Sequence, residues 1–251
     1  MTDIDYLVDI HKNTPRQGPG SEEETKKALS YLNLNGDKVK IADIGCGSGA
    51  QTLTLAKNTN SDIYAIDLFP QFLDELNEKS KKQKLADKIK AVKASMDDLP
   101  FGIDEFDIIW SEGAIYNIGF RNGIENWKRF LKPGGYLAVT EITWTTKDRP
   151  KPIDDHWVNE YPQIGNASSN ISILEENGFR LLSYFLLSEK SWMEEYYKPL
   201  ELKFGEFLVR HNNSQTANQI IDLMRDEIRK YNQYKAYYNY GFYIAQKVNE
   251  I

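Results

Sequence analysis

The chain has 251 residues, a net charge of −6 and a single cysteine, and these values exclude several classes of protein. A chain of this length can bury enough surface to fold without disulfides or a structural metal. No stretch approaches the ~20 apolar residues of a membrane span, so we expect no membrane association. The acidic balance disfavours a nucleic-acid partner, because binding to phosphates relies on a basic field. With Cys46 alone and no export signal, we expect a cytoplasmic protein.

The first half of the chain alternates short apolar runs with helix-favouring stretches. Ser21 and Glu24 have the spacing of a capping box, which predicts a helix from there to about Leu32. Further helices are predicted at residues 50–57, 70–82 and 121–131, and strands at 39–44, 63–66, 89–93, 106–110 and 136–140. This alternation favours right-handed crossovers and a doubly wound, mostly parallel α/β sheet.

The C-terminal third departs from this alternation. A helix ending at Gly178 precedes a strand predicted at 179–187, and a last strand is predicted at 241–248. Residues 192–239 are predicted to be mostly helical, with breaks at Pro199 and at Asn212 and Asn213. We interpret 144–168 and 188–239 as helical lid segments within one domain that spans residues 1–251. The tyrosine-dense run 231–240 is interpreted as packing of the last helix on the sheet, with an aromatic wall for an amine or planar substrate as the alternative.

The strongest local signal is the sequence DIGCGSG at residues 43–49, which lies between a predicted strand and a predicted helix. Glycines allow the backbone to turn sharply and a ligand to approach closely. Gly45, Gly47 and Ala50 also fit the spacing of a dinucleotide-binding loop. Asp67 follows Gly45 by 22 residues, where an acid binds the ribose of such a cofactor, so it fits either a dinucleotide or another adenosine cofactor.

Asp43 distinguishes between these cofactors. A pyrophosphate at this loop would meet a carboxylate at short range, in a partly dry site where repulsion is costly. S-adenosylmethionine instead carries an ammonium and a sulfonium, which a nearby carboxylate favours directly or through water. The residues therefore favour S-adenosylmethionine, and a nicotinamide dinucleotide remains the alternative.

From about Arg16 to Lys247, the chain resembles the class I S-adenosylmethionine-dependent methyltransferases, and more narrowly a bacterial small-molecule branch with an LPF signature. The resemblance rests on 43–49, on Asp67, and on the segments SMDDLPF at 95–101, FDIIWS at 106–111 and LKPGG at 131–135. It implies a Rossmann-like sheet of seven strands, the last antiparallel, with helices on both faces. It also implies S-adenosylmethionine as cofactor and S-adenosylhomocysteine as product. The residues that it assigns to the cofactor are Gln17, Asp43, Gly45, Cys46, Gly47, Gly49, Asp67, Leu68, Ser95, Met96, Asp97 and Ser111.

The resemblance implies specific roles for some of these residues. Asp67 would bind both ribose hydroxyls, and Leu68 would pack near the adenine. The family often has an acid where this chain has Ser95, so Asp97 could take over that polar contact. Residues 16–21 are similar to a stretch that folds over the cofactor in this branch.

Methyl transfer requires alignment of the nucleophile with the methyl group, and it requires a base only if the nucleophile starts protonated. Glu112 and Tyr116 follow the fourth predicted strand and are our candidates for substrate positioning or for the base. Glu141, His156 and Tyr161 are secondary candidates. One cysteine and three scattered histidines do not form a zinc site, so we expect no metal.

The sequence therefore predicts an S-adenosylmethionine-dependent methyltransferase that acts on a small molecule by in-line transfer. A nicotinamide-dependent oxidoreductase is one alternative, and a non-catalytic S-adenosylmethionine-binding module is the other. The acceptor, its nucleophilic atom and the oligomeric state are left open.

Overall fold

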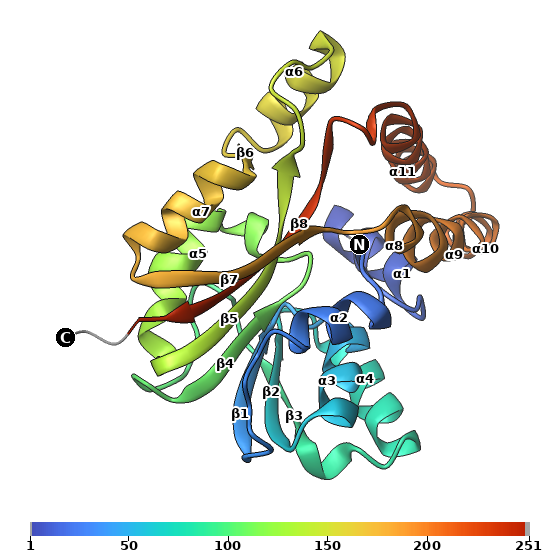
Figure 1. Cartoon of the computed structure of the whole chain (residues 1–251). Helices are drawn as coiled ribbons and strands as arrows, with labels where there is room; N and C mark the ends of the chain where they lie inside the picture. Colours follow the sequence, from blue (N-terminus) through green and yellow to red (C-terminus); the bar gives the residue numbers. More distant parts are fainter. Residues whose placement is uncertain (1, 249–251) are drawn as a thin grey trace.

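A computed structural model describes residues 2–248 and contains one continuous sheet (Figure 1). Its strands follow the order β3-β2-β1-β4-β5-β8-β7, and the two-residue β6 pairs with β5 off this path. All pairs are parallel except those that β8 forms with β5 and β7. The predicted doubly wound sheet with an antiparallel last strand is confirmed, with β6 as an addition. The strands are β1 Val39–Ile44, β2 Ser61–Asp67, β3 Ile89–Lys93, β4 Phe106–Ser111, β5 Leu131–Trp144, β6 Gly165–Asn166, β7 Phe179–Leu186 and β8 Tyr238–Lys247.

Helices cover both faces of the sheet, as predicted (Figure 1). One cluster of buried apolar side chains lies under α2, α3 and α4, and a second lies under α5 and α7. The helices are α1 Asp3–His11, α2 Glu22–Leu29, α3 Ala50–Asn58, α4 Pro70–Lys82, α5 Phe120–Trp127, α6 Lys151–Glu160, α7 Ala167–Glu176, α8 Glu189–Trp192, α9 Lys198–Glu201, α10 Phe204–Arg210 and α11 Gln215–Tyr234. Short helical turns are η1 Ala86–Lys88, η2 Ile115–Asn117, η3 Lys128–Phe130 and the π-helical η4 Met193–Tyr197.

Strand β5 is much longer than the predicted strand at 136–140. Its C-terminal part pairs with β8 along the whole stretch from Tyr136 to Trp144. Its N-terminal part pairs through Leu131 with Phe106, and the register then shifts before Tyr136. Pro133 and the two glycines after it lie in this irregular stretch. In the sequence these residues are typical of a turn, but in the structure the strand continues through them.

The predicted capping box at Ser21 is only half formed. The Ser21 hydroxyl accepts a hydrogen bond from the Glu24 backbone N–H at 3.1 Å, which caps α2 as predicted. The Glu24 carboxylate instead accepts hydrogen bonds from the Ser188 backbone N–H and the Ser191 hydroxyl, more than 160 residues along the chain. Glu24 therefore ties α2 to the start of α8.

The predicted break at Pro199 is wrong, whereas the break at Asn212 and Asn213 is confirmed. Helices α8, η4 and α9 follow one another without interruption. Pro199 lies in the first turn of α9, where its missing N–H costs little. Asn212 and Asn213 have φ angles of 53° and 50°, and they separate α10 from α11.

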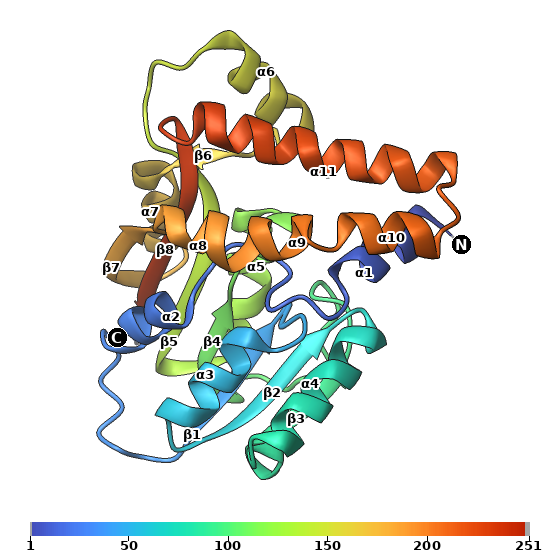
Figure 2. The ribbon, with the colours of Figure 1, turned by 90° about the vertical axis from the view of Figure 1, so that its right-hand side faces the viewer.

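Segment 188–239 joins the end of β7 to the start of β8. Because β7 is antiparallel to β8, both of these points lie at the edge where the parallel strands end. In Figure 2 the helices α8, α9 and α10 run end to end beside α11, next to that edge. Helix α1 contacts this layer through Asp9, which binds Arg210 at 2.9 Å and His211 at 2.8 Å. None of the helices described in residues 2–248 is long and apolar enough to cross a membrane.

Candidate active site

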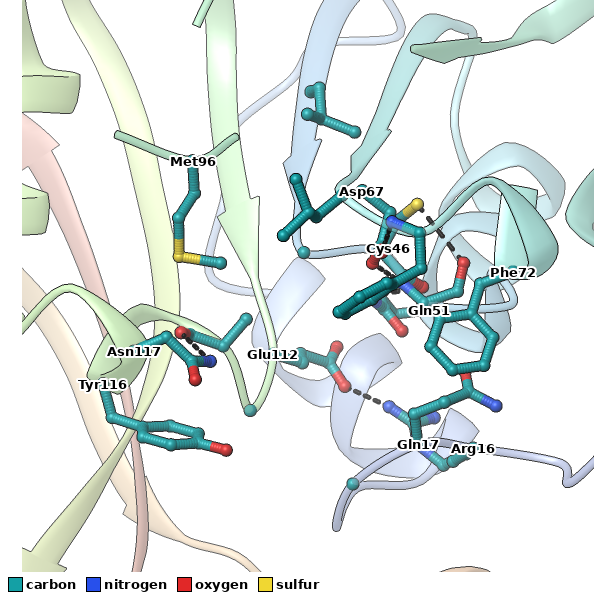
Figure 3. Close-up of a pocket in the computed structure, with 18 of the residues that line it drawn as sticks. Arg16, Gln17, Cys46, Gln51, Asp67, Phe72, Met96, Glu112, Tyr116 and Asn117 are labelled. Carbon is teal, nitrogen blue, oxygen red and sulfur yellow. Dashed lines mark hydrogen bonds and ion pairs between the residues drawn. The ribbon is translucent and has the colours of Figure 1, made fainter. Parts of the chain in front are cut away.

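A cavity of about 510 Å³ lies at the carboxyl edge of the sheet (Figure 3). Ligands of open α/β sheets bind at this edge. Five parts of the chain contribute lining residues: 16–19 before α2, 45–47 and 50–51 after β1, 66–69 and Phe72 from the end of β2 onward, 94–97 after β3, and 112–114 and 116–118 after β4. Four of these segments follow neighbouring strands, and the N-terminal segment completes the enclosure.

The glycine loop after β1 forms one wall of the cavity. Gly45 and Gly47 have φ angles of 73° and 53°, which favour glycine. A Cβ on Gly47 would lie 2.4 Å from the Gln17 Oε1 atom. The same oxygen accepts a hydrogen bond from the Ser48 N–H at 2.6 Å. The N-terminal segment therefore lies directly on the glycine loop, and Gln17 is placed at the cavity beside Gly47.

Asp43 lies one layer beneath the cavity rather than on its wall. Its side chain is fully buried and accepts hydrogen bonds from the Thr52 hydroxyl and the Gln51 side-chain amide. Burial raises the pKa of Asp43 to about 7. Gln51 lines the cavity, so it stands between Asp43 and a ligand. Any effect of this carboxylate on a cofactor is thus indirect.

Asp67 ends β2 and lines the cavity. Its carboxylate accepts a hydrogen bond from the Gly47 N–H at 2.8 Å and one from the Phe69 N–H at 2.9 Å. Burial raises the pKa of Asp67, and these backbone donors act in the opposite direction. Each oxygen keeps unused lone pairs, so the carboxylate can accept further hydrogen bonds from a ligand.

The segment after β3 provides the opposite wall, and Leu68 lies beside it on the cavity. The Ser95 hydroxyl donates to the Asp97 carboxylate, so these two side chains form one polar unit. The Met96 carbonyl oxygen accepts from the Trp127 indole N–H at 2.8 Å, which fixes the backbone at this point. This segment therefore offers a polar side-chain pair and a fixed backbone at the cavity.

Glu112 forms a buried network at the end of β4. Its carboxylate pairs with the Arg16 guanidinium and accepts hydrogen bonds from the Thr25 hydroxyl at 2.7 Å and the Trp110 indole N–H at 2.9 Å. Gly20 makes room for this, since a Cβ there would lie 2.5 Å from the Arg16 Nη2 atom. A carboxylate that holds three donors favours a positioning role over the role of a base.

Tyr116 lies at the other end of the cavity from the glycine loop (Figure 3). The residue as a whole is 37% exposed, yet burial raises the pKa of its hydroxyl, as expected for a side chain that faces an enclosed space. The ring centroids of Tyr161 and Tyr240 lie 6.2 and 6.5 Å away. Tyr116 thus lies between the cavity and the rings of Tyr161 and Tyr240.

Two of the secondary candidates lie behind Tyr116. Glu141 lies within β5 and is almost fully buried, and burial raises its pKa to about 8. The Tyr161 hydroxyl accepts a hydrogen bond from the Phe120 N–H at 3.2 Å. His156 instead lies against Lys230 on α11, with its Nδ1 atom 3.3 Å from the lysine Nζ, and is not part of the cavity lining.

Three residues that the sequence assigned to the cofactor do not line the cavity: Asp43, Gly49 and Ser111. Gly49 has a φ of 85° and is the N-cap residue of α3, where a Cβ would lie 2.2 Å from Leu76. Ser111 is fully buried, and its hydroxyl has no hydrogen-bond partner among residues 2–248. These residues therefore support the glycine loop and the end of β4 without lining the cavity.

Sequence reasoning missed several residues of the lining, among them Gln51, Phe69 and Phe72. The phenylalanines follow Asp67 closely, and a site at the end of β2 could have suggested them. Arg16 lies in the predicted segment 16–21, but its pairing with Glu112 could not be predicted, because the two residues are 96 positions apart. Across residues 2–248 there is no group of three metal-ligating side chains that could hold an ion.

Residues 42–139 match the family model of a methyltransferase domain. Over 103 residues the chain is 30% identical to a sarcosine/dimethylglycine N-methyltransferase of Aphanothece halophytica, covering 41% of this chain and 37% of the relative. The solved S-adenosylmethionine-dependent methyltransferase from Geobacter sulfurreducens, in complex with S-adenosylhomocysteine, superposes with a TM-score of 0.83 at 17% identity and covers 98% of both chains. These matches support a class I S-adenosylmethionine-dependent methyltransferase, with the family model covering residues 42–139.

The chain spans less than half the length of the curated relatives that it matches first. The methyltransferase fold also occurs in the solved [4+2]-cyclase SpnF, which matches with a TM-score of 0.78 at 18% identity and covers 98% of this chain and 93% of SpnF. The likeness to solved structures therefore shows the fold, and the chemistry must be argued from the site.

Proposed function

We propose that the protein transfers a methyl group from S-adenosylmethionine to a small-molecule acceptor. The observation that carries this proposal is the placement of the Asp67 carboxylate beside Gly45 and Gly47 at adjacent strand ends, in one cavity. The cavity volume of about 510 Å³ lies within the usual range of small-ligand sites.

The residues present fit this cofactor. Asp67 would bind the ribose hydroxyls with its remaining lone pairs, and the segment from Ser95 to Asp97 would meet the adenine. The backbone at Gly45 and Gly47, which has no room for a Cβ, would hold the amino-acid part. Arg16 lies at the cavity as the partner of Glu112, and it could meet a ligand carboxylate on its other donors.

Bound S-adenosylmethionine would supply a methyl group that its positively charged sulfur activates for transfer. The task of the protein is then to align the acceptor and exclude water. Gln17 and Arg16 hold the N-terminal segment over the glycine loop, which closes one side of the cavity. Tyr116 faces the remaining space and is proposed to position the acceptor.

A nicotinamide-dependent oxidoreductase is the competing function, and calorimetry separates the two. We expect S-adenosylhomocysteine to bind the pure protein and NADH not to bind. Tight NADH binding without S-adenosylhomocysteine binding would refute the proposal. The match of residues 42–139 to the family model of a methyltransferase domain supports this expectation.

A binding module without catalysis is the third possibility, and turnover tests it. Incubation with methyl-labelled S-adenosylmethionine and a broad metabolite extract should give a labelled small molecule. Cofactor binding without any labelled product would support the module. We also propose a small-molecule acceptor rather than a nucleic acid, and a cytoplasmic location, which the acidic charge and the single cysteine support.

A further inference from the structure

Gln51, in the first turn of α3, is a cavity residue to which the proposed function gives no role. It is 5% exposed, and it lines the cavity on the same side as Cys46 and Asp67 (Figure 3). Burying an amide is costly unless its nitrogen and its oxygen find partners. The partners of these two atoms therefore decide what Gln51 can offer to a ligand.

The amide nitrogen of Gln51 is fully engaged within the protein. Nε2 donates to the Asp43 Oδ1 atom at 3.2 Å and to the Cys46 carbonyl oxygen at 3.4 Å, which uses both of its hydrogens. Turning the amide round would place Oε1 against these two acceptors, so the hydrogen bonds fix its orientation. The Cys46 carbonyl is an acceptor at every pH, so this orientation does not depend on the ionisation of Asp43.

The amide oxygen of Gln51 is thereby left for a ligand. Among residues 2–248 no donor binds Oε1, and protein atoms do not shut this oxygen off from the cavity. The Asp43 carboxylate behind the amide polarises it, since chains of hydrogen bonds strengthen one another. Gln51 therefore presents a good acceptor oxygen, and no donor, to the cavity.

Gln51 and Asp67 approach the glycine loop from opposite sides. Asp67 accepts a hydrogen bond from the Gly47 N–H at 2.8 Å, whereas Gln51 donates to the Cys46 carbonyl. These two backbone groups belong to the same peptide unit, and in a trans peptide they point in opposite directions. If the ribose lies at Asp67, Gln51 faces a different part of the cofactor.

S-adenosylmethionine carries N–H or O–H donors at three places: the adenine amine, the ribose hydroxyls and the α-ammonium group. The proposed function assigns the adenine to the segment 95–97 and the ribose to Asp67. We propose that the Gln51 Oε1 atom accepts a hydrogen bond from the α-ammonium group, and that this contact selects a cofactor with a charged amine. This inference rests on the proposed function, because it names how the same cavity recognises that cofactor.

The first test compares two ligands on the wild-type protein by calorimetry at pH 7. One is S-adenosylhomocysteine, and the other is its deamino analogue, in which a hydrogen atom replaces the ammonium group. We expect S-adenosylhomocysteine to bind at least about tenfold more tightly, because a hydrogen bond to a charged group is stronger than one between neutral groups. Equal affinities would overturn the proposal.

The variant Gln51→Met keeps the length of the side chain and removes its oxygen. We expect it to weaken S-adenosylhomocysteine about tenfold and to change the affinity of the deamino analogue less than about twofold. Gln51→Ala, which suits a helix, should show the same selective loss if the methionine variant does not fold. An equal loss for both ligands would show a structural role, and this result or no loss at all would refute the proposal.

Thr52→Val is the matched control, because it changes the same carboxylate without changing the cavity. The Thr52 hydroxyl donates to Asp43, is fully buried and does not line the cavity. The ratio of the two ligand affinities should stay at its wild-type value in this variant. If Thr52→Val lowers the ratio as much as Gln51→Met does, both residues act through Asp43 and the proposed contact is wrong.

The same measurements separate this inference from the proposed function. A wild type that binds S-adenosylhomocysteine and its deamino analogue equally refutes the ammonium contact alone. A wild type that does not bind S-adenosylhomocysteine refutes the proposed function itself.

Discussion

The Arg16 guanidinium and the Glu112 carboxylate form a buried ion pair that joins the N-terminal segment to the end of β4. The side chains are 8% and 3% exposed. Thr25 and Trp110 also donate hydrogen bonds to this carboxylate, so α2 and β4 meet at the same point. The enclosure of the cavity therefore depends on one charged contact between distant parts of the chain.

We expect Arg16→Met and Glu112→Gln each to lower the free energy of unfolding by about 3–5 kcal/mol, because each leaves the other charge buried without its partner. The double variant should lose clearly less than the sum of the two. Urea unfolding of the four proteins measures the coupling. Strictly additive losses would show that the two charges do not interact.

Asp67→Ala should weaken S-adenosylhomocysteine binding by at least about tenfold, because the ribose hydroxyls lose a charged acceptor. Calorimetry measures this directly. Asp62→Ala is the matched control, since Asp62 lies on the same strand but its partner is the exposed Lys38. Unchanged affinity in Asp67→Ala would remove this residue from the cofactor site.

Gly47→Ala should destabilise the protein by about 1–3 kcal/mol, because the position has a φ of 53° and the added Cβ would meet Gln17. The second change Gln17→Ala should restore part of the loss by making space, although the backbone strain remains. Thermal unfolding of the single and double variants checks this. If Gln17→Ala restores nothing, the N-terminal segment does not rest on the loop.

Burial raises the pKa of Glu141 to about 8, above its usual value near 4.5. Between these two values the folded state holds a proton that the unfolded state has released, so this group makes stability fall as pH rises. Glu141→Gln should therefore gain stability over the wild type from about pH 5 to pH 8, by at most about 1.4 kcal/mol for each pH unit. Unfolding measured across this range tests the sign, and parallel profiles for both proteins would contradict it.

Much of the fold could be predicted because its signals are local. The helix from Pro70 to Lys82 was predicted at its observed bounds, since a proline in the first turn and the apolar spacing lie within one segment. The glycine loop and Asp67 were likewise found, because strand, turn and acid follow in order along the chain. Strand β5 was predicted too short, because its ends are stabilised by pairing with β8, about a hundred residues away.

The sequence by itself determined the sheet type, the edge at which ligands bind and the loop that lines the cavity, because each follows from spacing within one strand–turn–helix unit. Only the tertiary structure decided that Glu24 binds Ser188 rather than closing its own cap, that Arg16 neutralises Glu112, and that Glu141 is buried. These outcomes depend on which side chains meet across the fold, and the desolvation of a charge is set by those neighbours rather than by its own segment.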